Sequence, residues 1–222
     1  MIKQLFIGIY TEGPTDDRFL ESITKRTIEE VAFTCPGDFD IELFPIKIQK
    51  SGLSFIEQVL EAIRTGVDEF GIMALCVHTD ADYEDDSVAM ENKIKPLLDE
   101  INTQGDEFCK VVIPIIPVYM SEAWMLADKN LLKNQIGTLK SDRELGINKD
   151  PETVADPKYM INEAIRIAIA DLGKRRRRAL FIKDLYLPIG QSIALDQLAA
   201  LSSYKKFKKN VEQAFRDLHF LY

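Results

Sequence analysis

Short apolar segments alternate with longer segments of helical periodicity over the first half of the chain. The segments that are rich in aliphatic, β-branched or aromatic residues predict four strands, at residues 4–10, 40–48, 70–77 and 110–118. Between them, apolar side chains recur every three or four residues, which predicts amphipathic helices. Strands that alternate with helices in this way predict an α/β fold with a parallel sheet flanked by helices.

The pattern changes after residue 119. Two short helical patterns are followed by a polar, loop-like segment at residues 137–157, and two longer apolar stripes then predict further helices. The sequence therefore predicts an α/β domain over residues 1–128 and a mainly helical C-terminal extension over residues 129–222 that packs on it.

Charge is divided unevenly along the chain. The 222 residues carry a net charge of -8, yet the segment from residue 171 onward holds 11 Lys and Arg against 5 Asp and Glu. An acidic part is thus joined to a basic one, which suits a metal site and a phosphate-binding segment in one protein. No apolar run approaches the roughly 20 residues that cross a bilayer, so we expect a cytoplasmic protein with no membrane partner.

Acidic residues follow two of the predicted strands at the point where each strand ends. Glu12 follows the first strand, and Asp80 and Asp82 follow the third. Because the carboxyl ends of parallel strands meet at one edge of a sheet, we expect the three side chains to form a carboxylate cluster. Such carboxylates repel one another unless a proton or cation lies among them, and Mg²⁺ and Mn²⁺ prefer oxygen ligands. The sequence therefore predicts a Mg²⁺ or Mn²⁺ site, in which Glu12 is a ligand or a general acid or base.

Several of these residues also fit structural roles. Asp16 suits the N-terminus of the helix after the first strand as well as it suits a metal ion. The AspXAsp spacing alone also fits transfer from a nucleoside diphosphate sugar, a function that leaves Glu12 and Gly13 unexplained. We expect Trp124 and His78 to pack in the interior, and the three cysteines, which lack CxxC spacing, to be buried free thiols.

Two segments resemble the two signatures of the Toprim domain, IYTEGPTDDRFL after the first strand and ALCVHTDADYED after the third. Within that group the chain resembles a bacterial Toprim-like family of unknown function whose members often lie beside ATPase genes. The segment SEAW at residues 121–124 and less specific C-terminal segments such as residues 190–194 are similar to that family as well. The resemblance implies a Toprim-like, Rossmann-like fold with a parallel four-stranded sheet, and a separate ATPase as partner.

The chain also resembles Toprim nucleases of the overcoming-lysogenization-defect type. This resemblance implies catalytic roles for Glu12, Asp80, Asp82 and Lys183. It implies metal ligation by Glu12, Asp16, Asp80, Asp82 and Glu122. Ser121 and Glu122 are adjacent here, whereas those nucleases separate the corresponding pair by one residue.

A run of five cations lies in the basic part of the chain and comprises Lys174, Arg175, Arg176, Arg177 and Arg178. Such a run can be a solvated loop or can grip a nucleic-acid backbone, and its place in the basic part favours phosphate contact. It contains no aromatic residue that would stack on a base.

These features together predict a metal-dependent phosphodiesterase, a nuclease that acts on DNA or RNA, of which DNA is the expected substrate. The resemblance places it in bacterial defence or DNA processing with an ATPase partner, and it allows a homodimer. The alternative is a noncatalytic Toprim-like subunit of an ATPase complex that binds metal or nucleotide in the acidic pocket. The chain contains no GxSxG elbow and no GxxxxGK[ST] phosphate loop that would indicate another chemistry.

Overall fold

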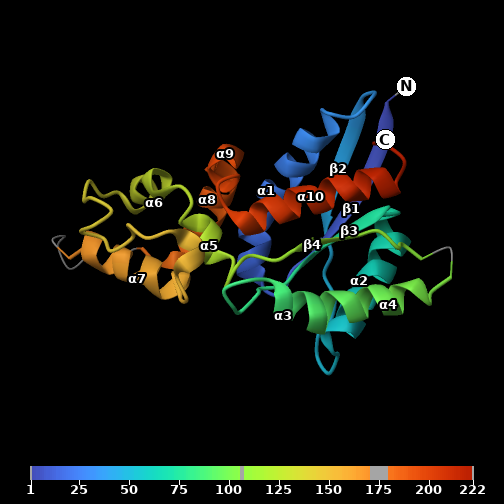
Figure 1. The fold of residues 1–222 in the computed structure, drawn as a ribbon, viewed down its shortest axis with the longest axis horizontal. Coiled ribbons are helices and arrows are strands. Elements are labelled where there is room, and N and C mark those ends of the chain that lie inside the picture. Colours follow the sequence, from blue (N-terminus) through green and yellow to red (C-terminus); the bar gives the residue numbers. More distant parts are fainter. Residues whose placement is uncertain (1, 106–107, 171–179, 222) are drawn as a thin grey trace.

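A four-stranded parallel sheet forms the centre of the protein (Figure 1). The computed structural model describes residues 2–105, 108–170 and 180–221. The strands are β1 (Lys3–Tyr10), β2 (Phe39–Pro45), β3 (Ala74–His78) and β4 (Val112–Ile115). They pair in the order β2-β1-β3-β4, and each pair is parallel. The predicted α/β fold with a parallel four-stranded sheet is confirmed, and it is consistent with a Rossmann-like, Toprim-type fold.

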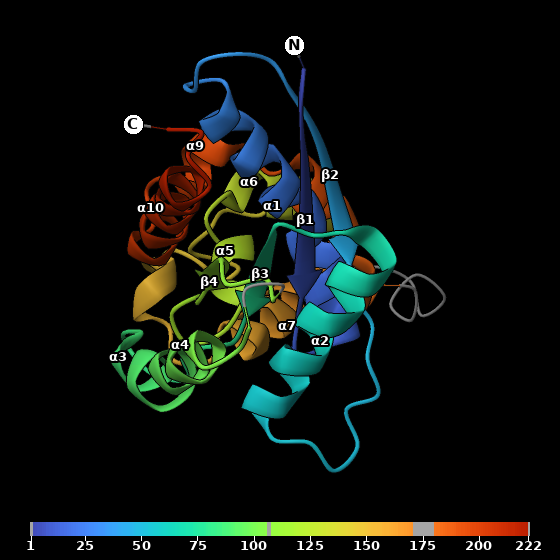
Figure 2. The ribbon, with the colours of Figure 1, turned by 90° about the vertical axis from the view of Figure 1, so that its right-hand side faces the viewer.

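Helices cover both faces of the sheet (Figure 2). Because side chains alternate along a strand, Leu5, Ile7 and Ile9 enter one hydrophobic core whereas Tyr10 enters the other. The first core is closed by α1 (Pro14–Ala32) and α10 (Ser202–Asp217). The second is closed by α2 (Phe55–Phe70) and α4 (Lys95–Asn102).

The helix before the central strand ends later than the sequence pattern indicates. Helix α2 begins with a capping box between Ser54 and Glu57 and ends at Gly71, whose φ of 63° is the left-handed conformation that glycine adopts readily. Phe70 therefore belongs to the last turn of α2, and β3 begins only at Ala74. The predicted strand at residues 70–77 was right in existence and wrong at its start, because an apolar run does not distinguish a helix end from a strand.

A π-helical turn precedes α4. Helix α3 (Ser87–Ala89) continues into the π-helix η1 (Met90–Ile94), and α4 follows directly. Pro96, in the first turn of α4, has no N–H to donate, and its ring would crowd the carbonyl of Asn92 in a regular α-helix. The wider π turn accommodates the proline, and it contains Lys93.

The C-terminal extension is mainly helical, as predicted. Its elements are α6 (Lys129–Ile136), η2 (Pro151–Thr153), α7 (Pro157–Ala168), η3 (Ile182–Asp184), α8 (Tyr186–Ser192) and α9 (Leu195–Leu198), followed by α10. The short helix α5 (Glu122–Met125) precedes them, within residues 1–128. Trp124 is fully buried, as expected, and its indole N–H donates to Ser203 Oγ at 2.7 Å. The three cysteines are free and buried, also as expected. Within the described ranges, no helix is long and apolar enough to span a bilayer.

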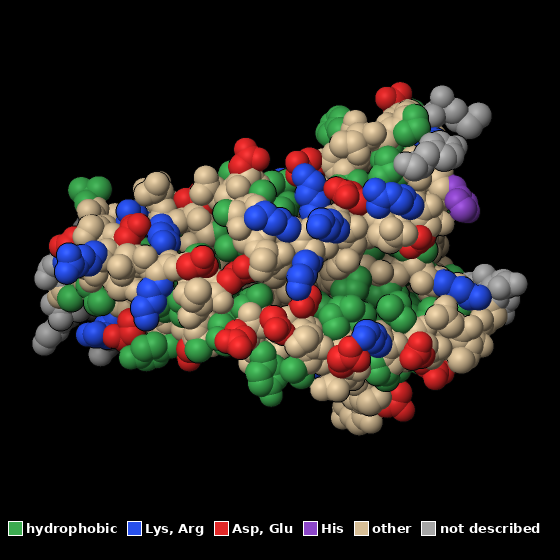
Figure 3. Space-filling model, viewed as in Figure 1, with side chains coloured by type: hydrophobic (Ala, Val, Ile, Leu, Met, Phe, Trp, Pro, Cys, Tyr) green, Lys and Arg blue, Asp and Glu red, His purple; other side chains and the backbone are tan. Residues whose placement is uncertain are grey.

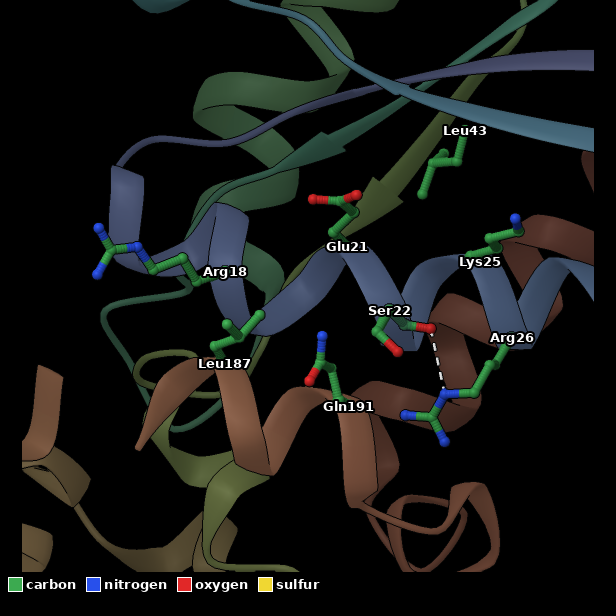
Figure 4. Close-up of a pocket in the computed structure, with 8 residues that line it drawn as sticks. All are labelled: Arg18, Glu21, Ser22, Lys25, Arg26, Leu43, Leu187 and Gln191. Carbon is green, nitrogen blue, oxygen red and sulfur yellow. Dashed lines mark hydrogen bonds between the residues drawn. The ribbon is translucent and has the colours of Figure 1, made fainter. Parts of the chain in front are cut away.

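Helices α1 and α8 pack with their backbones in close contact. A Cβ atom on Gly190 would lie 2.3 Å from the carbonyl oxygen of Phe19. The guanidinium of Arg26 joins the same helices, because it donates to the carbonyls of Gly190 at 2.8 Å and Ile193 at 2.7 Å. Arg26 also donates to the carbonyl of Ser22 and lines a surface pocket of about 290 Å³ between these helices (Figure 4). Arg26 therefore stabilises the packing of the extension on α1.

Candidate functional site

The two acidic motifs lie at the point where the sheet reverses its strand order. Strand β1 lies between β2 and β3, and the helices that follow β1 and β2 cover opposite faces of the sheet (Figure 2). The carboxyl ends of the two strands on either side of such a switch point form the crevice in which α/β proteins bind ligands. Glu12 follows β1 and Asp80 follows β3, so the sequence places both at this crevice.

Glu12 is held beside β3 by two hydrogen bonds. Its Oε1 accepts from the hydroxyl of Thr79 at 2.5 Å and from the ammonium of Lys93 at 3.1 Å. Lys50 approaches from the other side and donates to the Glu12 carbonyl at 2.9 Å. The Glu12 side chain is 40% exposed, so its second oxygen remains accessible to a ligand.

Ser121 joins two further carboxylates. Its backbone N–H donates to Asp80 Oδ1 at 2.9 Å, and its hydroxyl donates to Asp16 Oδ1 at 2.8 Å. Burial raises the pKa of Asp16, and the neighbouring charges of Asp80 and Glu122 raise it further, although His78 and the Ser121 hydroxyl act in the opposite direction. Asp16 and Asp80 thus lie side by side in an environment that disfavours two uncompensated negative charges.

Glu122 is a buried carboxylate at the start of α5. Its side chain is only 7% exposed, and its Oε1 accepts a hydrogen bond from the hydroxyl of Tyr186 on α8. The ammonium of Lys158 on α7 lies 3.6 Å from the same oxygen, and Ser121 Oγ lies 3.5 Å from Oε2. The C-terminal extension therefore supplies side chains to the carboxyl end of the sheet.

His78 is a fully buried polar side chain at the end of β3. Its Nε2 lies 3.3 Å from Asp80 Oδ1, but neither ring nitrogen has an aligned hydrogen-bond partner in the described structure. A buried polar group without such a partner is unfavourable. The burial of His78 confirms the expected interior position, and its Nε2 points toward Asp80.

We refer to Glu12, Asp16, Asp80 and Glu122 as the carboxylate cluster. The structure brings Asp16, Asp80 and Glu122 together through Ser121 and direct electrostatic interaction. Glu12 is linked to them only through Thr79, the chain neighbour of Asp80. The N-cap of α1 is Gly13, and neither aspartate of its first turn is the N-cap. Asp16 accepts a hydrogen bond from Ser121. Asp17 accepts a hydrogen bond from Thr11 and pairs with Lys47.

Other predicted site residues lie elsewhere. Asp82 is exposed, has a φ of 59°, and is fixed through its backbone N–H to the Tyr119 carbonyl rather than through its carboxylate. Lys183 is exposed on η3, where its ammonium lies 5.3 Å from the centre of the Phe181 ring. The basic run from Lys174 to Arg178 lies outside the described residues.

Four residues around the cluster were given no role from the sequence. Lys93, Lys158, Tyr186 and Thr79 contact Glu12 or Glu122. Thr79 directly precedes Asp80 at the end of β3, so its position in the sequence could have indicated that it lies at the site. The other three come from distant helices, and no sequence spacing indicates their approach.

The donor set suits a divalent cation that takes few protein ligands. Within the described ranges, no group of three or more His, Cys, Asp or Glu side chains is arranged so that it could hold a metal ion. Mg²⁺ usually binds one or two carboxylates and takes its remaining oxygens from water and substrate phosphates. The pair formed by Asp16 and Asp80 meets that smaller requirement.

Comparison with known proteins identifies no relative. No family model matches the chain, and no curated protein or solved structure gives a match. The fold and the site therefore define the class of this protein by themselves: it is an α/β protein with a carboxylate cluster at the carboxyl end of a four-stranded parallel sheet.

Proposed function

We propose that the protein is a Mg²⁺- or Mn²⁺-dependent phosphodiesterase that cleaves nucleic acid, with DNA favoured over RNA. The observation that carries the proposal is the carboxylate cluster at the switch point of the sheet, where Ser121 holds Asp16 and Asp80 together. The fully buried His78 lies beside it, with Nε2 3.3 Å from Asp80 Oδ1. Lys93 and Lys158 lie beside Glu12 and Glu122, whereas no Lys or Arg pairs with Asp16 or Asp80 among the described residues. Two adjacent carboxylates without such a partner are unfavourable, and a divalent ion would supply the compensating charge.

Asp16 and Asp80 are the residues that would hold the ion, with Glu122 beside them. Ser121 fixes both carboxylates through one N–H and one hydroxyl, so their positions depend on a single residue. Bound Mg²⁺ or Mn²⁺ would supply Lewis-acid chemistry to a phosphodiester. Asp82 and Lys183 stay predicted participants that this assignment does not require.

Glu12 would act as the general base. Its Oε1 is held by Thr79 and Lys93, which leaves Oε2 to take the proton of a water molecule that attacks phosphorus. Lys93 lies beside Glu12, and Lys158 lies beside Glu122. Both ammonium groups would counter the negative charge that develops on the phosphate oxygens.

A noncatalytic function is favoured by a different observation. Lys93 already neutralises Glu12, and the described residues contain no group of three or more metal-binding side chains. A subunit that binds metal or nucleotide in this crevice and contributes an interface to an ATPase would have these features. The ATPase and a homodimer rest on the family resemblance, and a cytoplasmic location rests on the apolar pattern of the sequence. All three are part of the proposal.

Cleavage assays separate the two functions. Single- and double-stranded DNA and RNA would be incubated with Mg²⁺ or Mn²⁺ and either the wild-type protein, Asp80→Ala or the control Asp99→Ala, which changes an exposed aspartate on α4. We expect metal-dependent cleavage by the wild type and the control, and a loss of about 100-fold or more in Asp80→Ala. Equal cleavage by all three proteins would indicate a contaminating nuclease, and no cleavage by the wild type would favour the noncatalytic subunit.

A further inference from the structure

Helix α10 concentrates positive charge in a protein that is acidic as a whole. Its 16 residues include the cations Lys205, Lys206, Lys208, Lys209 and Arg216 and only the two anions Glu212 and Asp217. The whole chain carries a net charge of -8. Such a local excess marks a surface that attracts anions, which the charge of the whole molecule does not reveal.

The cations lie on the outward face of the helix. Tyr204, Phe207 and Phe215 are buried against the rest of the protein. Lys205, Lys209 and Arg216 are exposed and follow one another at helical spacing along the opposite side. Figure 3 shows Lys and Arg side chains gathered in a row over the position that α10 occupies in Figure 1. We call Lys205, Lys209 and Arg216 the α10 basic row.

Most of this charge is not neutralised by the protein itself. Lys205 contacts the carbonyl of Ala200 at 3.3 Å. Within the described part of the chain, no ion pair involves Lys205, Lys209 or Arg216, whereas Lys208 pairs with Glu30 at 2.8 Å. The row therefore presents three cations to an incoming partner.

The row begins next to the carboxylate cluster. Ser203, in the first turn of α10, accepts the hydrogen bond from Trp124, which belongs to the same short helix α5 as Glu122. Lys206 pairs at 2.7 Å with Asp86, in the loop that follows Asp80 and Asp82. A long polyanion bound along α10 would therefore extend toward the carboxyl end of the sheet.

We infer that the α10 basic row binds the phosphate backbone of double-helical DNA, an inference that rests on the proposed nuclease function and names its substrate class. Phosphate contacts need only positive charge, whereas proteins that bind single strands place exposed aromatic side chains where bases can stack. Tyr204, Phe207 and Phe215 of α10 are all buried, so its outward face offers cations and other polar side chains but no aromatic ring. A duplex, whose bases are stacked internally, fits this surface.

The spacing of the row suits several phosphates. At about 1.5 Å of rise per residue, Lys205 and Lys209 are separated by about 6 Å along the helix axis. Each strand of DNA carries a phosphate for about every 3.4 Å of its axis, so both ammonium groups can contact phosphates at the same time. Each contact releases counterions, which makes the affinity depend on salt.

Salt-dependent binding tests the inference. Binding of a fluorescent 30-base-pair duplex and of the matching single strand would be measured by anisotropy with Ca²⁺ in place of Mg²⁺, over a series of salt concentrations. The test protein is Lys205→Gln/Lys209→Gln. The control is Arg64→Gln/Lys95→Gln, which removes two exposed cations from α2 and α4 on the opposite face of the sheet.

For the α10 variant we expect duplex binding at least about 10-fold weaker at 0.1 M salt and a slope of log K against log salt reduced by about 1.8. The control should match the wild type. The inference would be overturned if the α10 variant kept the affinity and salt slope of the wild type. It would also be overturned if the wild type did not bind the duplex, or bound the single strand more tightly than the duplex. Metal-dependent hydrolysis of bis(p-nitrophenyl) phosphate, which is too small to reach α10, would be measured in parallel. Its loss on Asp80→Ala tests the proposed chemistry separately.

Discussion

The hydroxyl of Tyr186 forms a hydrogen bond with a buried carboxylate, whereas the hydroxyl of Tyr204 forms one with a neutral hydroxyl group. Tyr186 donates to the carboxylate of Glu122, and Tyr204 shares a 2.8 Å hydrogen bond with the hydroxyl of Thr27. Both tyrosines are 1% exposed. Hydrogen bonds to charged groups contribute about 1.5–3 kcal/mol to stability, and those between neutral groups contribute about 1 kcal/mol.

We therefore expect Tyr186→Phe to lower the free energy of unfolding about twice as much as Tyr204→Phe. Urea denaturation of the two variants and the wild type measures the difference. Equal losses of unfolding free energy in the two variants would mean that the hydrogen bond from Tyr186 does not stabilise an anionic Glu122. If Glu122 belongs to the proposed site, Tyr186→Phe should also lower metal-dependent cleavage, whereas Tyr204→Phe should not.

Some residues of the site could be located from the sequence, and others could not. Glu12 and Asp80 could be located from the sequence because each follows an apolar strand, and parallel strands end at the same edge. Lys93 could not, because it lies on η1, 81 residues beyond Glu12 in the chain, and no spacing indicates their contact. Asp82 shows the reverse case. Its motif predicts a ligand, and that role stays a prediction, but the sequence does not indicate that Asp82 is exposed with a left-handed φ of 59°.

At the scale of the element, α2 depends on its first turn. Ser54 Oγ accepts from the backbone N–H of Glu57 at 3.3 Å, and the Glu57 carboxylate accepts from the backbone N–H of Ser54 at 2.7 Å. Replacing such a cap by alanine costs about 1 kcal/mol. We expect this loss in Ser54→Ala and a change of less than about 0.5 kcal/mol in Ser51→Ala, an exposed residue in the preceding turn. Chemical denaturation compares the two, and an equal effect would exclude the cap as the cause.

The contact between α1 and α8 depends on the absence of a side chain at Gly190. A Cβ atom there would lie 2.3 Å from the Phe19 carbonyl oxygen, so one helix must move. Overpacking of this kind costs about 1–3 kcal/mol, against which alanine gains up to about 1 kcal/mol in a helix interior. Gly190→Ala should therefore be less stable than the wild type in thermal or urea unfolding. Gln191→Ala, at the exposed neighbouring position, is the control, and a stabilised Gly190→Ala would contradict the close contact.

Element types were easier to predict than element boundaries. The four strands were predictable because apolar runs of β-branched and aliphatic residues are short and separated by turns. The start of β3 was not, because Phe70 packs as the end of α2 and only the conformation of Gly71 marks the change. The last predicted strand, at residues 110–118, is confined to Val112–Ile115, since pairing with β3 rather than hydrophobicity sets its length.

At the scale of the whole molecule, one hydrophobic core crosses the boundary that the sequence suggests between the α/β domain and its extension. Cys76 from the central strand, Trp124 from α5 and Phe207 from α10 belong to the same cluster of buried residues. Ile161 of α7 and Ile189 of α8 belong to it as well. A core shared in this way predicts that the sheet and the extension unfold together.

Two native reporters can test this cooperativity, because Trp124 is the single tryptophan and Cys76 is a thiol with no exposed surface. Burial raises the pKa of Cys76 above its usual range, so its reactive thiolate forms only after unfolding. In Cys35→Ala/Cys109→Ala, where Cys76 is the remaining thiol, we expect Trp124 fluorescence and labelling by a disulfide reagent to change with the same midpoint in urea. Trp124 reports on the extension because Tyr204 and Phe207 of α10 pack against its ring. A tryptophan transition that precedes thiol exposure would show that the extension separates first, and the shared core would then not couple the two parts. Coincident transitions would mean that substitutions in the extension, such as Gly190→Ala, also lower the stability of the sheet that carries the carboxylate cluster.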